Sequence, residues 1–214
     1  MLHIVYGGSA SGKSSYAESF AMSLQGDGRL LYIATMYPYK WNTTEIDPET
    51  MQRIERHRAM RADKGFDTVE CYRYVEHIVA KRQDVLLLEC MSNLLANEMY
   101  LGAENDDGGR PAMADMEKAE TDGNAGFDMA DAQTLSPVSE RIVRALIDLS
   151  TRVQELVIVT NDVFSDGGSL TYDESTREYV KNLAEINCAL AREAETVTEV
   201  VCGIPVKIKG DKQP

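Results

Sequence analysis

The stretch Gly7-Gly8-Ser9-Ala10-Ser11-Gly12-Lys13-Ser14 follows a short apolar run, Leu2-His3-Ile4-Val5-Tyr6, and leads directly into a helical pattern that extends to Leu24. Its residues match G-x-x-x-x-G-K-[ST], the pattern of a phosphate-binding loop, and they lie between a strand and a helix as that loop requires. The glycines permit a tight turn in which successive backbone N–H groups point at a phosphate. The unpaired N–H groups of the following helix face the same anion. We therefore predict a nucleoside triphosphate site here.

Two side chains of this loop have specific expected roles. Lys13 is expected to reach the outer phosphates of the nucleotide, and the Ser14 hydroxyl is expected to bind Mg²⁺. The alternative is a glycine-rich turn that binds nothing. The strand before the loop and the helix after it count against that alternative.

The composition indicates one globular domain that spans residues 1–214. Of the 214 residues, 43% are hydrophobic, which is enough for a well-buried core. No apolar run approaches the ~20 residues that span a bilayer, and no secretory signal is recognisable, so we expect a cytoplasmic protein. The net charge of −13 argues against a nucleic-acid partner. The scattered cysteines favour buried thiols over disulfides or zinc ligands: Cys71, Cys90, Cys188 and Cys202.

Much of the negative charge lies in one segment, residues 102–135. It holds nine acidic residues against two basic ones, a net charge of −7, and it is rich in Ala, Gly, Asp and Met. A segment this polar cannot bury enough apolar surface to fold firmly. We expect an acidic, disordered or loosely helical insert within the domain.

Apolar runs alternate with helical patterns along the rest of the chain, which predicts an α/β fold. Strands are expected near residues 2–6, 30–35, 68–72, 84–90 and 155–161, with two short strands forming a hairpin between 196 and 209. Helices are expected after residue 14, over 48–61, up to about 81, over 92–101, from 137 and over 173–194, the second of them capped by Asp47. Continuous apolar strands of this kind form a mostly parallel sheet that helices cover on both faces.

Ligands of such sheets bind outside the carboxyl ends of the strands. The segments that follow strands are the phosphate-binding loop, residues 35–37, Glu89 and Asn161-Asp162, so we expect them to line one crevice. Glu89 is suited to hold Mg²⁺, directly or through water, or to accept hydrogen bonds from a ribose. A helix-capping role for Glu89 is the alternative.

His57 lies on a predicted helix among arginines. Arg53 and Arg61 are one helical turn away on the same face, and Arg56 and Arg58 are its neighbours in sequence. Nearby cations disfavour the imidazolium and keep the ring neutral and nucleophilic, while the arginines can bind a triphosphate. The arrangement suits a covalent histidine–nucleotide intermediate. Spacing alone favours the alternative, a solvated basic helix face that includes a histidine.

Several stretches together resemble the bifunctional adenosylcobinamide kinase/adenosylcobinamide-phosphate guanylyltransferase (CobU) family. They comprise the phosphate-binding loop, Tyr32-Ile33-Ala34-Thr35, Arg53-Ile54-Glu55-Arg56-His57-Arg58, Thr68-Val69-Glu70, Leu87-Leu88-Glu89-Cys90, Val159-Thr160-Asn161-Asp162-Val163, Asn187, and Gly203-Ile204-Pro205-Val206-Lys207-Ile208-Lys209. The loop alone is unspecific, but the ordered set is specific, and it covers most of the chain outside the acidic insert.

The resemblance implies a P-loop nucleotide-binding fold and an enzyme of cobalamin biosynthesis that works in two steps. It would phosphorylate adenosylcobinamide with ATP or GTP, then transfer GMP from GTP through His57 to adenosylcobinamide phosphate, with Mg²⁺ as cofactor. It also implies a homotrimer. By motif position, the nucleotide contacts would be Gly7, Gly8, Ser9, Ala10, Ser11, Gly12, Lys13, Ser14, Thr35, Met36, Tyr37, Arg58, Ala59, Met60, Arg61, Glu70 and Glu89.

The chain departs from the family pattern after Asn161. Gly168-Ser169-Leu170-Thr171 replaces an expected Gly-Ile-Val-Pro, and Lys181 and Ala184 stand where an acid and a glycine are expected. Two other functions therefore stay open. One is a small-molecule P-loop kinase without a covalent intermediate. The other is a nucleotide-binding regulatory module, although the Asn-Lys-x-Asp signature of switch GTPases is missing.

Overall fold

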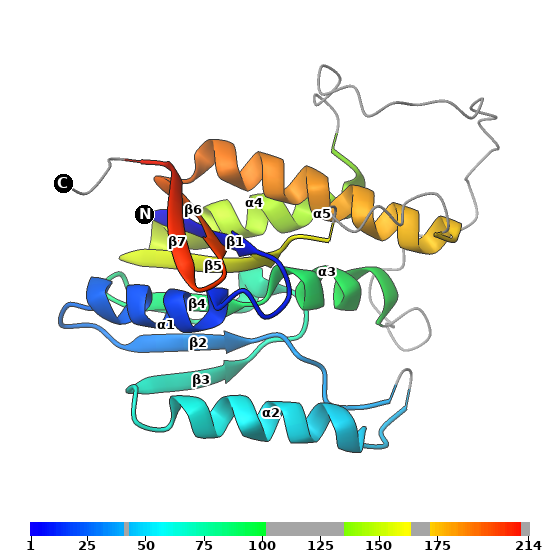
Figure 1. Cartoon of the computed structure of the whole chain (residues 1–214), viewed down its shortest axis with the longest axis horizontal. Coiled ribbons are helices and arrows are strands. Elements are labelled where there is room, and N and C mark those ends of the chain that lie inside the picture. The colour runs from blue at the N-terminus through cyan, green and yellow to red at the C-terminus, as the bar shows by residue number, and fades with distance from the viewer. Residues whose placement is uncertain (41–42, 102–134, 164–171, 211–214) are drawn as a thin grey trace.

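The computed structural model describes residues 1–40, 43–101, 135–163 and 172–210. These residues form a seven-stranded sheet in the order β3-β2-β4-β5-β1-β6-β7 (Figure 1). The strands are β1 Leu2–Gly7, β2 Leu30–Ala34, β3 Phe66–Glu70, β4 Val85–Glu89, β5 Glu155–Asn161, β6 Thr196–Val201 and β7 Ile204–Lys209. The helices are α1 Lys13–Leu24, α2 Pro48–Arg61, α3 Met91–Tyr100, α4 Pro137–Arg152 and α5 Glu174–Glu193, with a short 3-10 helix at Val75–His77.

Neighbouring strands of the sheet run parallel, except for the C-terminal hairpin of β6 and β7. This confirms the predicted α/β class, the mostly parallel sheet and the hairpin. The polar residues that follow β1, β2, β4 and β5 are therefore brought to the same edge of the sheet. That edge is where the crevice was expected.

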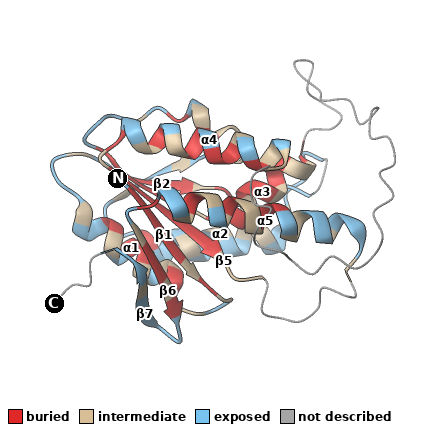
Figure 2. Ribbon diagram, turned by 90° about the horizontal axis from the view of Figure 1, so that it is seen from above, coloured by how far each residue is buried: buried red, intermediate tan, exposed pale blue. Residues whose placement is uncertain are grey.

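The core consists of two apolar layers, one on each face of the sheet. Leu86, Leu88 and Leu156 pack with α3, α4 and α5, whereas Leu87 and Val157 pack with α1 on the opposite face. Successive side chains of a strand point to opposite faces, so continuous apolar runs are what a doubly covered sheet needs. Figure 2 shows the central strands buried along their length, while β7 is mostly exposed.

Helix starts follow the expected chemistry. The Asp47 side chain accepts a hydrogen bond from the backbone N–H of Thr50 at 3.2 Å, with Pro48 at the first helical position. Ser136 caps α4 in the same way through the N–H of Ser139 at 3.2 Å. These caps fix where α2 and α4 begin, and α2 carries His57 into the site.

Some expectations are corrected. The third strand is Phe66–Glu70 rather than 68–72, because Phe66 pairs with Leu30 and sets the register. The helix expected to end near residue 81 is only the 3-10 turn Val75–His77, after which the chain extends so that the Ile78 side chain is buried. Of the cysteines expected to be buried, Cys188 and Cys202 are exposed.

Three further expectations concern the acidic insert, the cysteines and membrane-spanning helices. Residues 102–134 of the acidic insert and the stretch Gly168-Ser169-Leu170-Thr171 lie outside the described residues. The four cysteines are free thiols, as predicted. Within the described ranges, no helix is long and apolar enough to cross a membrane.

Candidate functional site

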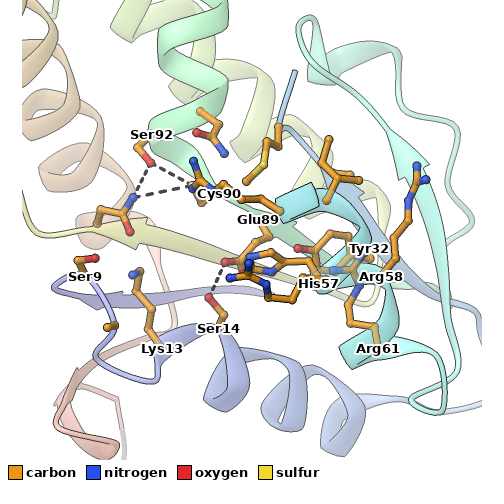
Figure 3. A pocket seen from close by; sticks show the side chains of 18 of the residues that line it. Ser9, Lys13, Ser14, Tyr32, His57, Arg58, Arg61, Glu89, Cys90 and Ser92 are labelled. Carbon is orange, nitrogen blue, oxygen red and sulfur yellow. Dashed lines mark hydrogen bonds between the residues drawn. The ribbon is translucent and has the colours of Figure 1, made fainter. Parts of the chain in front are cut away.

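A pocket of about 630 Å³ opens at the carboxyl ends of the strands. The phosphate-binding loop forms one wall, and α2 forms another with His57 and four arginines. The ends of β4 and β5 contribute Glu89 and Asn161. Figure 3 shows Lys13 and His57 entering this space from different elements. The sequence-predicted crevice is therefore present and includes the histidine.

Glycine is required at two positions of the loop. Gly12 has a φ of 91°, in the left-handed region, and a Cβ there would lie 3.2 Å from the Cα of Gly203. A Cβ on Gly7 would lie 2.6 Å from the carbonyl oxygen of Val200. The turn of the β6–β7 hairpin also braces the loop, since the N–H of Gly203 donates to the carbonyl of Ser11 at 2.8 Å. Sequence reasoning missed this brace, because it joins segments far apart in the chain.

Lys13 and Ser14 lie at the start of α1. Lys13 is buried, and its Nζ donates to the carbonyl of Gly8 at 3.1 Å, which folds the side chain back over the loop. The Ser14 hydroxyl donates to Oε1 of Glu89 at 2.6 Å (Figure 3). The motif thus places an ammonium, a hydroxyl and a carboxylate together, as sequence reasoning expected.

Glu89 is an unusual carboxylate. Burial raises its pKa to about 7, against the opposing effects of the Ser14 hydrogen bond and of the Lys13 and Arg61 charges. Its Oε2 is buried and finds no hydrogen-bond partner among the described residues. Carboxylate and hydroxyl oxygens are ligands that Mg²⁺ prefers, so Glu89 and Ser14 together fit that ion. No cluster of three or more metal-ligating side chains occurs in the described part of the chain, so phosphates and water would supply the remaining ligands.

His57 is half-buried on α2 and faces the pocket. Burial lowers its pKa, and the charges of Arg61 and Arg53 lower it further. The pKa of His57 is therefore shifted in the direction that the sequence predicted. Burial is the larger cause, however, and spacing alone does not show it. A neutral imidazole in contact with the pocket is chemically able to act as a nucleophile.

Arg61 is the buried arginine of α2. Its guanidinium carbon lies 3.4 Å from the centroid of the Tyr32 ring, a cation–π contact. Its Nε and Nη1 are buried without a hydrogen-bond partner in the described structure. Unpaired buried N–H groups beside a histidine favour an anionic ligand. Tyr32 was missed by sequence reasoning, because its position over Arg61 depends on how β2 and α2 pack.

A second link joins α2 to the sheet edge. Arg58 forms an ion pair with Glu70 at the end of β3. The Tyr72 hydroxyl donates to the other oxygen of Glu70 at 2.9 Å. Both side chains of the ion pair are about half exposed, so the pair contributes little to stability. It does hold the chain after β3 against the helix that carries His57.

The predicted nucleotide contacts fall into three groups. Those that line the pocket are Ser9, Ala10, Lys13, Ser14, Met36, Arg58, Arg61, Glu70 and Glu89, together with His57. Gly7, Gly8, Ser11 and Gly12 form the backbone of the loop. The others lie apart from the pocket lining: Thr35, Tyr37, Ala59 and Met60.

Each of these last residues has a definite place. Thr35 is buried, and its hydroxyl donates to the carbonyl of Glu89 at 2.9 Å and accepts from the N–H of Cys90 at 2.8 Å. These two hydrogen bonds fix the backbone that carries the Glu89 side chain. Ala59 and Met60 lie on the exposed side of α2, and Tyr37 lines a neighbouring pocket. Nucleotide contacts by these residues stay predictions.

The far wall of the pocket includes residues that sequence reasoning did not single out. Ser92 and Asn93 lie in the first turn of α3, after Cys90 and Met91, and they line the pocket. The Asn161 side chain donates to the Ser92 hydroxyl at 2.6 Å. Polar residues three and four positions after the end of β4 were the available signal for Ser92 and Asn93.

The parallel sheet and the loop between β1 and α1 define a P-loop nucleotide-binding protein. A family model described as "Cobinamide kinase / cobinamide phosphate guanyltransferase" matches residues 3–208. The chain belongs to this family. It is 31% identical over 218 residues to the bifunctional adenosylcobalamin biosynthesis protein CobU of Salmonella typhimurium, with 98% of this chain and 100% of that protein covered. The Escherichia coli protein of the same name is 31% identical over 216 residues, with the same coverage of both chains.

A search of solved structures gives a weaker likeness. The flagellar accessory protein FlaH of Methanocaldococcus jannaschii has a TM-score of 0.42 and 12% identity, with 99% of this chain and 81% of that chain covered. A likeness of this size says nothing about function. The assignment to the family rests on the sequence matches.

Proposed function

We propose that this protein is a bifunctional enzyme of cobalamin biosynthesis. It phosphorylates adenosylcobinamide with ATP or GTP and then transfers GMP from GTP to adenosylcobinamide phosphate, which gives adenosylcobinamide-GDP. The observation that carries the proposal is one pocket that holds both Lys13 of the phosphate-binding loop and His57, a histidine with a lowered pKa. The names of the relatives supply the substrate class.

The first step is phosphoryl transfer. The hydroxyl oxygen of the acceptor attacks the γ-phosphorus, the bond between that phosphorus and the β-phosphate oxygen breaks, and the hydroxyl proton leaves to solvent. Lys13 and the loop N–H groups hold the phosphates in place. Ser14, with Glu89 nearby, would hold Mg²⁺, which would neutralise part of the phosphate charge. Positioning and charge stabilisation are the catalytic contributions that such a loop makes.

The second step passes through His57. A neutral ring nitrogen attacks the α-phosphorus of GTP, a P–N bond forms, and pyrophosphate leaves. A phosphate oxygen of the acceptor then attacks the same phosphorus, and the P–N bond breaks to regenerate neutral His57. The other ring nitrogen keeps its proton throughout. Arg61, which lines the pocket and whose Nε and Nη1 have no hydrogen-bond partner among the described residues, stabilises the charge that develops on the α-phosphate.

Other features of the proposal follow from the family. We infer a homotrimer and a cytoplasmic location, where nucleotide substrates are available. A kinase without a covalent intermediate is the main competitor, and the lowered pKa of His57 favours the guanylyltransferase over it. A regulatory module would have no use for a nucleophile in its nucleotide pocket.

A product assay tests the two-step reaction. Purified protein is incubated with adenosylcobinamide, Mg²⁺, ATP and GTP, and the corrinoid products are separated by chromatography and identified by mass. We expect the phosphate and then the GDP derivative from the wild-type protein. His57→Ala should stop at the phosphate, and Glu55→Ala, which alters an exposed residue of α2 outside both pockets, should form both products. Formation of the GDP derivative by His57→Ala would contradict the proposal.

A further inference from the structure

A second pocket, of about 890 Å³, lies beside the first. It is formed by the chain after β2, the end of β3 with the segment that follows, and Leu101 after α3. Glu70 and Tyr72 line both pockets, so they form a shared wall. The two spaces therefore meet at Tyr72 and at Glu70, which Arg58 ties to α2.

The two pockets differ in chemical character. The first has Lys13 and arginines of α2 in its lining, as a triphosphate requires. The second is lined largely by aromatic and aliphatic side chains: Tyr37, Val69, Tyr72, Tyr74, Ile78 and Val79.

The charged residues of the second pocket are already engaged. Arg73 pairs with the buried carboxylate of Glu98, with 3.4 Å between Nε and Oε2, and its guanidinium lies over the Tyr74 ring. Glu70 is bound by Arg58 and by the Tyr72 hydroxyl. With these charges engaged, the lining favours an apolar ligand that carries neutral polar groups over a phosphate.

We propose that the second pocket binds the corrin ring of the acceptor while the nucleotide occupies the first. This inference rests on the proposed function. The acceptor must present a hydroxyl, and later a phosphate, to a nucleotide in the first pocket, while its broad ring needs a surface outside that pocket. A volume of about 630 Å³ suits a single ligand of nucleotide size, and pockets of several hundred Å³ typically hold one such ligand.

The side chains that line the second pocket match the chemical groups of a corrin ring. Corrin rings are broad and largely apolar, with amide groups on their periphery. Tyrosine faces pack against apolar ring surfaces, and tyrosine hydroxyls bind amides. Tyr37 makes edge contacts with Tyr39 and Tyr72, with ring centroids 5.3 and 5.4 Å apart, so this aromatic surface is held in place before the ligand arrives. The part of the acceptor that carries the reacting hydroxyl or phosphate then extends past Glu70 and Tyr72 toward His57.

Two filling substitutions test the site. Val79→Trp and Thr44→Trp place a large ring in the second pocket from different segments, and both residues are exposed, Val79 at 87%, so the fold tolerates them. Val206→Trp, at a half-exposed position on β7 outside both pockets, is the matched control. Binding of adenosylcobinamide to each protein is measured by titration calorimetry, and self-labelling by GTP carrying label in its α-phosphate is measured in parallel.

We expect Val79→Trp and Thr44→Trp to weaken adenosylcobinamide binding at least tenfold and to leave self-labelling unchanged, while Val206→Trp changes neither. Unchanged binding of adenosylcobinamide in both variants, with labelling intact, would overturn the assignment of this pocket and leave the proposed function standing. Loss of self-labelling in either variant would also overturn it, because the two pockets would then not be separate sites. A wild-type protein that binds GTP but takes no label would instead contradict the proposed function itself.

Discussion

Arg61 is held against Tyr32 with its guanidinium carbon 3.4 Å from the ring centroid, and this contact joins α2 to β2 beside His57. It explains how an arginine can be buried in a helix that otherwise exposes most of its side chains. The Phe66 ring packs against Tyr32 in an edge-to-face arrangement, with centroids 6.0 Å apart. We infer that Tyr32 is a positioning residue that holds Arg61 at the wall of the pocket.

Replacing Tyr32 tests that role. Tyr32→Leu should slow self-labelling by GTP about 30-fold, because a desolvated cation–π contact contributes about 2 kcal/mol. Tyr32→Phe keeps the ring and should stay within about threefold of wild type. The rate of label incorporation and the GTP dissociation constant are measured separately. Equal losses in Tyr32→Phe and Tyr32→Leu would show that the ring face does not position Arg61.

The protonation state of His57 predicts a pH profile. Its pKa lies below the usual value of about 6.5, so the imidazole is neutral and reactive at pH 7. Self-labelling should fall only as the pH drops through this lowered pKa, where the imidazolium forms. Arg53→Gln removes one of the charges that lower the pKa and should move the acidic limb to higher pH. A limb that does not move would mean that another group controls the rate.

Lys13→Ala removes the ammonium that is expected to bind the outer phosphates. Because one preorganised charge-stabilising group contributes on the order of 100-fold or more, the kinase rate should fall by at least that factor. Thermal stability should change little, since Lys13 makes only one hydrogen bond, to the carbonyl of Gly8, among the described contacts. Steady-state phosphorylation of adenosylcobinamide provides the measurement. A kinase rate near that of wild type would mean that the loop does not hold the transferred phosphate.

Backbone geometry in the loop can be tested with two opposite substitutions. Gly12→Ala places a side chain at a φ of 91° and should cost about 1–2 kcal/mol of unfolding free energy, with a loss of GTP affinity. Ala10, at a φ of 55°, is the converse case, and Ala10→Gly should leave stability unchanged or slightly raised. Thermal unfolding with and without GTP measures both. Equal unfolding temperatures for the two variants would contradict the argument from φ.

The features that sequence predicted well are local. The phosphate-binding loop, the Asp47 cap and the apolar runs of β4 and β5 are each encoded in a few consecutive residues. For His57, the spacing of the arginines alone favoured a solvated helix face. The resemblance to the family is what pointed to a place in the nucleotide site.

The features that were missed depend on packing between distant segments. The Arg61–Tyr32 stack, the brace from Gly203 to Ser11 and the support of Glu89 by Thr35 each join elements whose contact no local pattern reveals. The segment after β3 was predicted as a helix because its apolar residues are spaced helically. It extends instead, with Ile78 buried and Val79 exposed.

The central claim is that His57 carries the nucleotide. Wild-type protein and His57→Ala are incubated with Mg²⁺ and GTP labelled at the α-phosphate, and the denatured chains are then separated by electrophoresis. We predict an acid-labile, base-stable label on the wild-type chain and none on His57→Ala, with GTP affinity similar in both. Undiminished labelling of His57→Ala, or no label on a wild-type protein that binds GTP, would contradict the account.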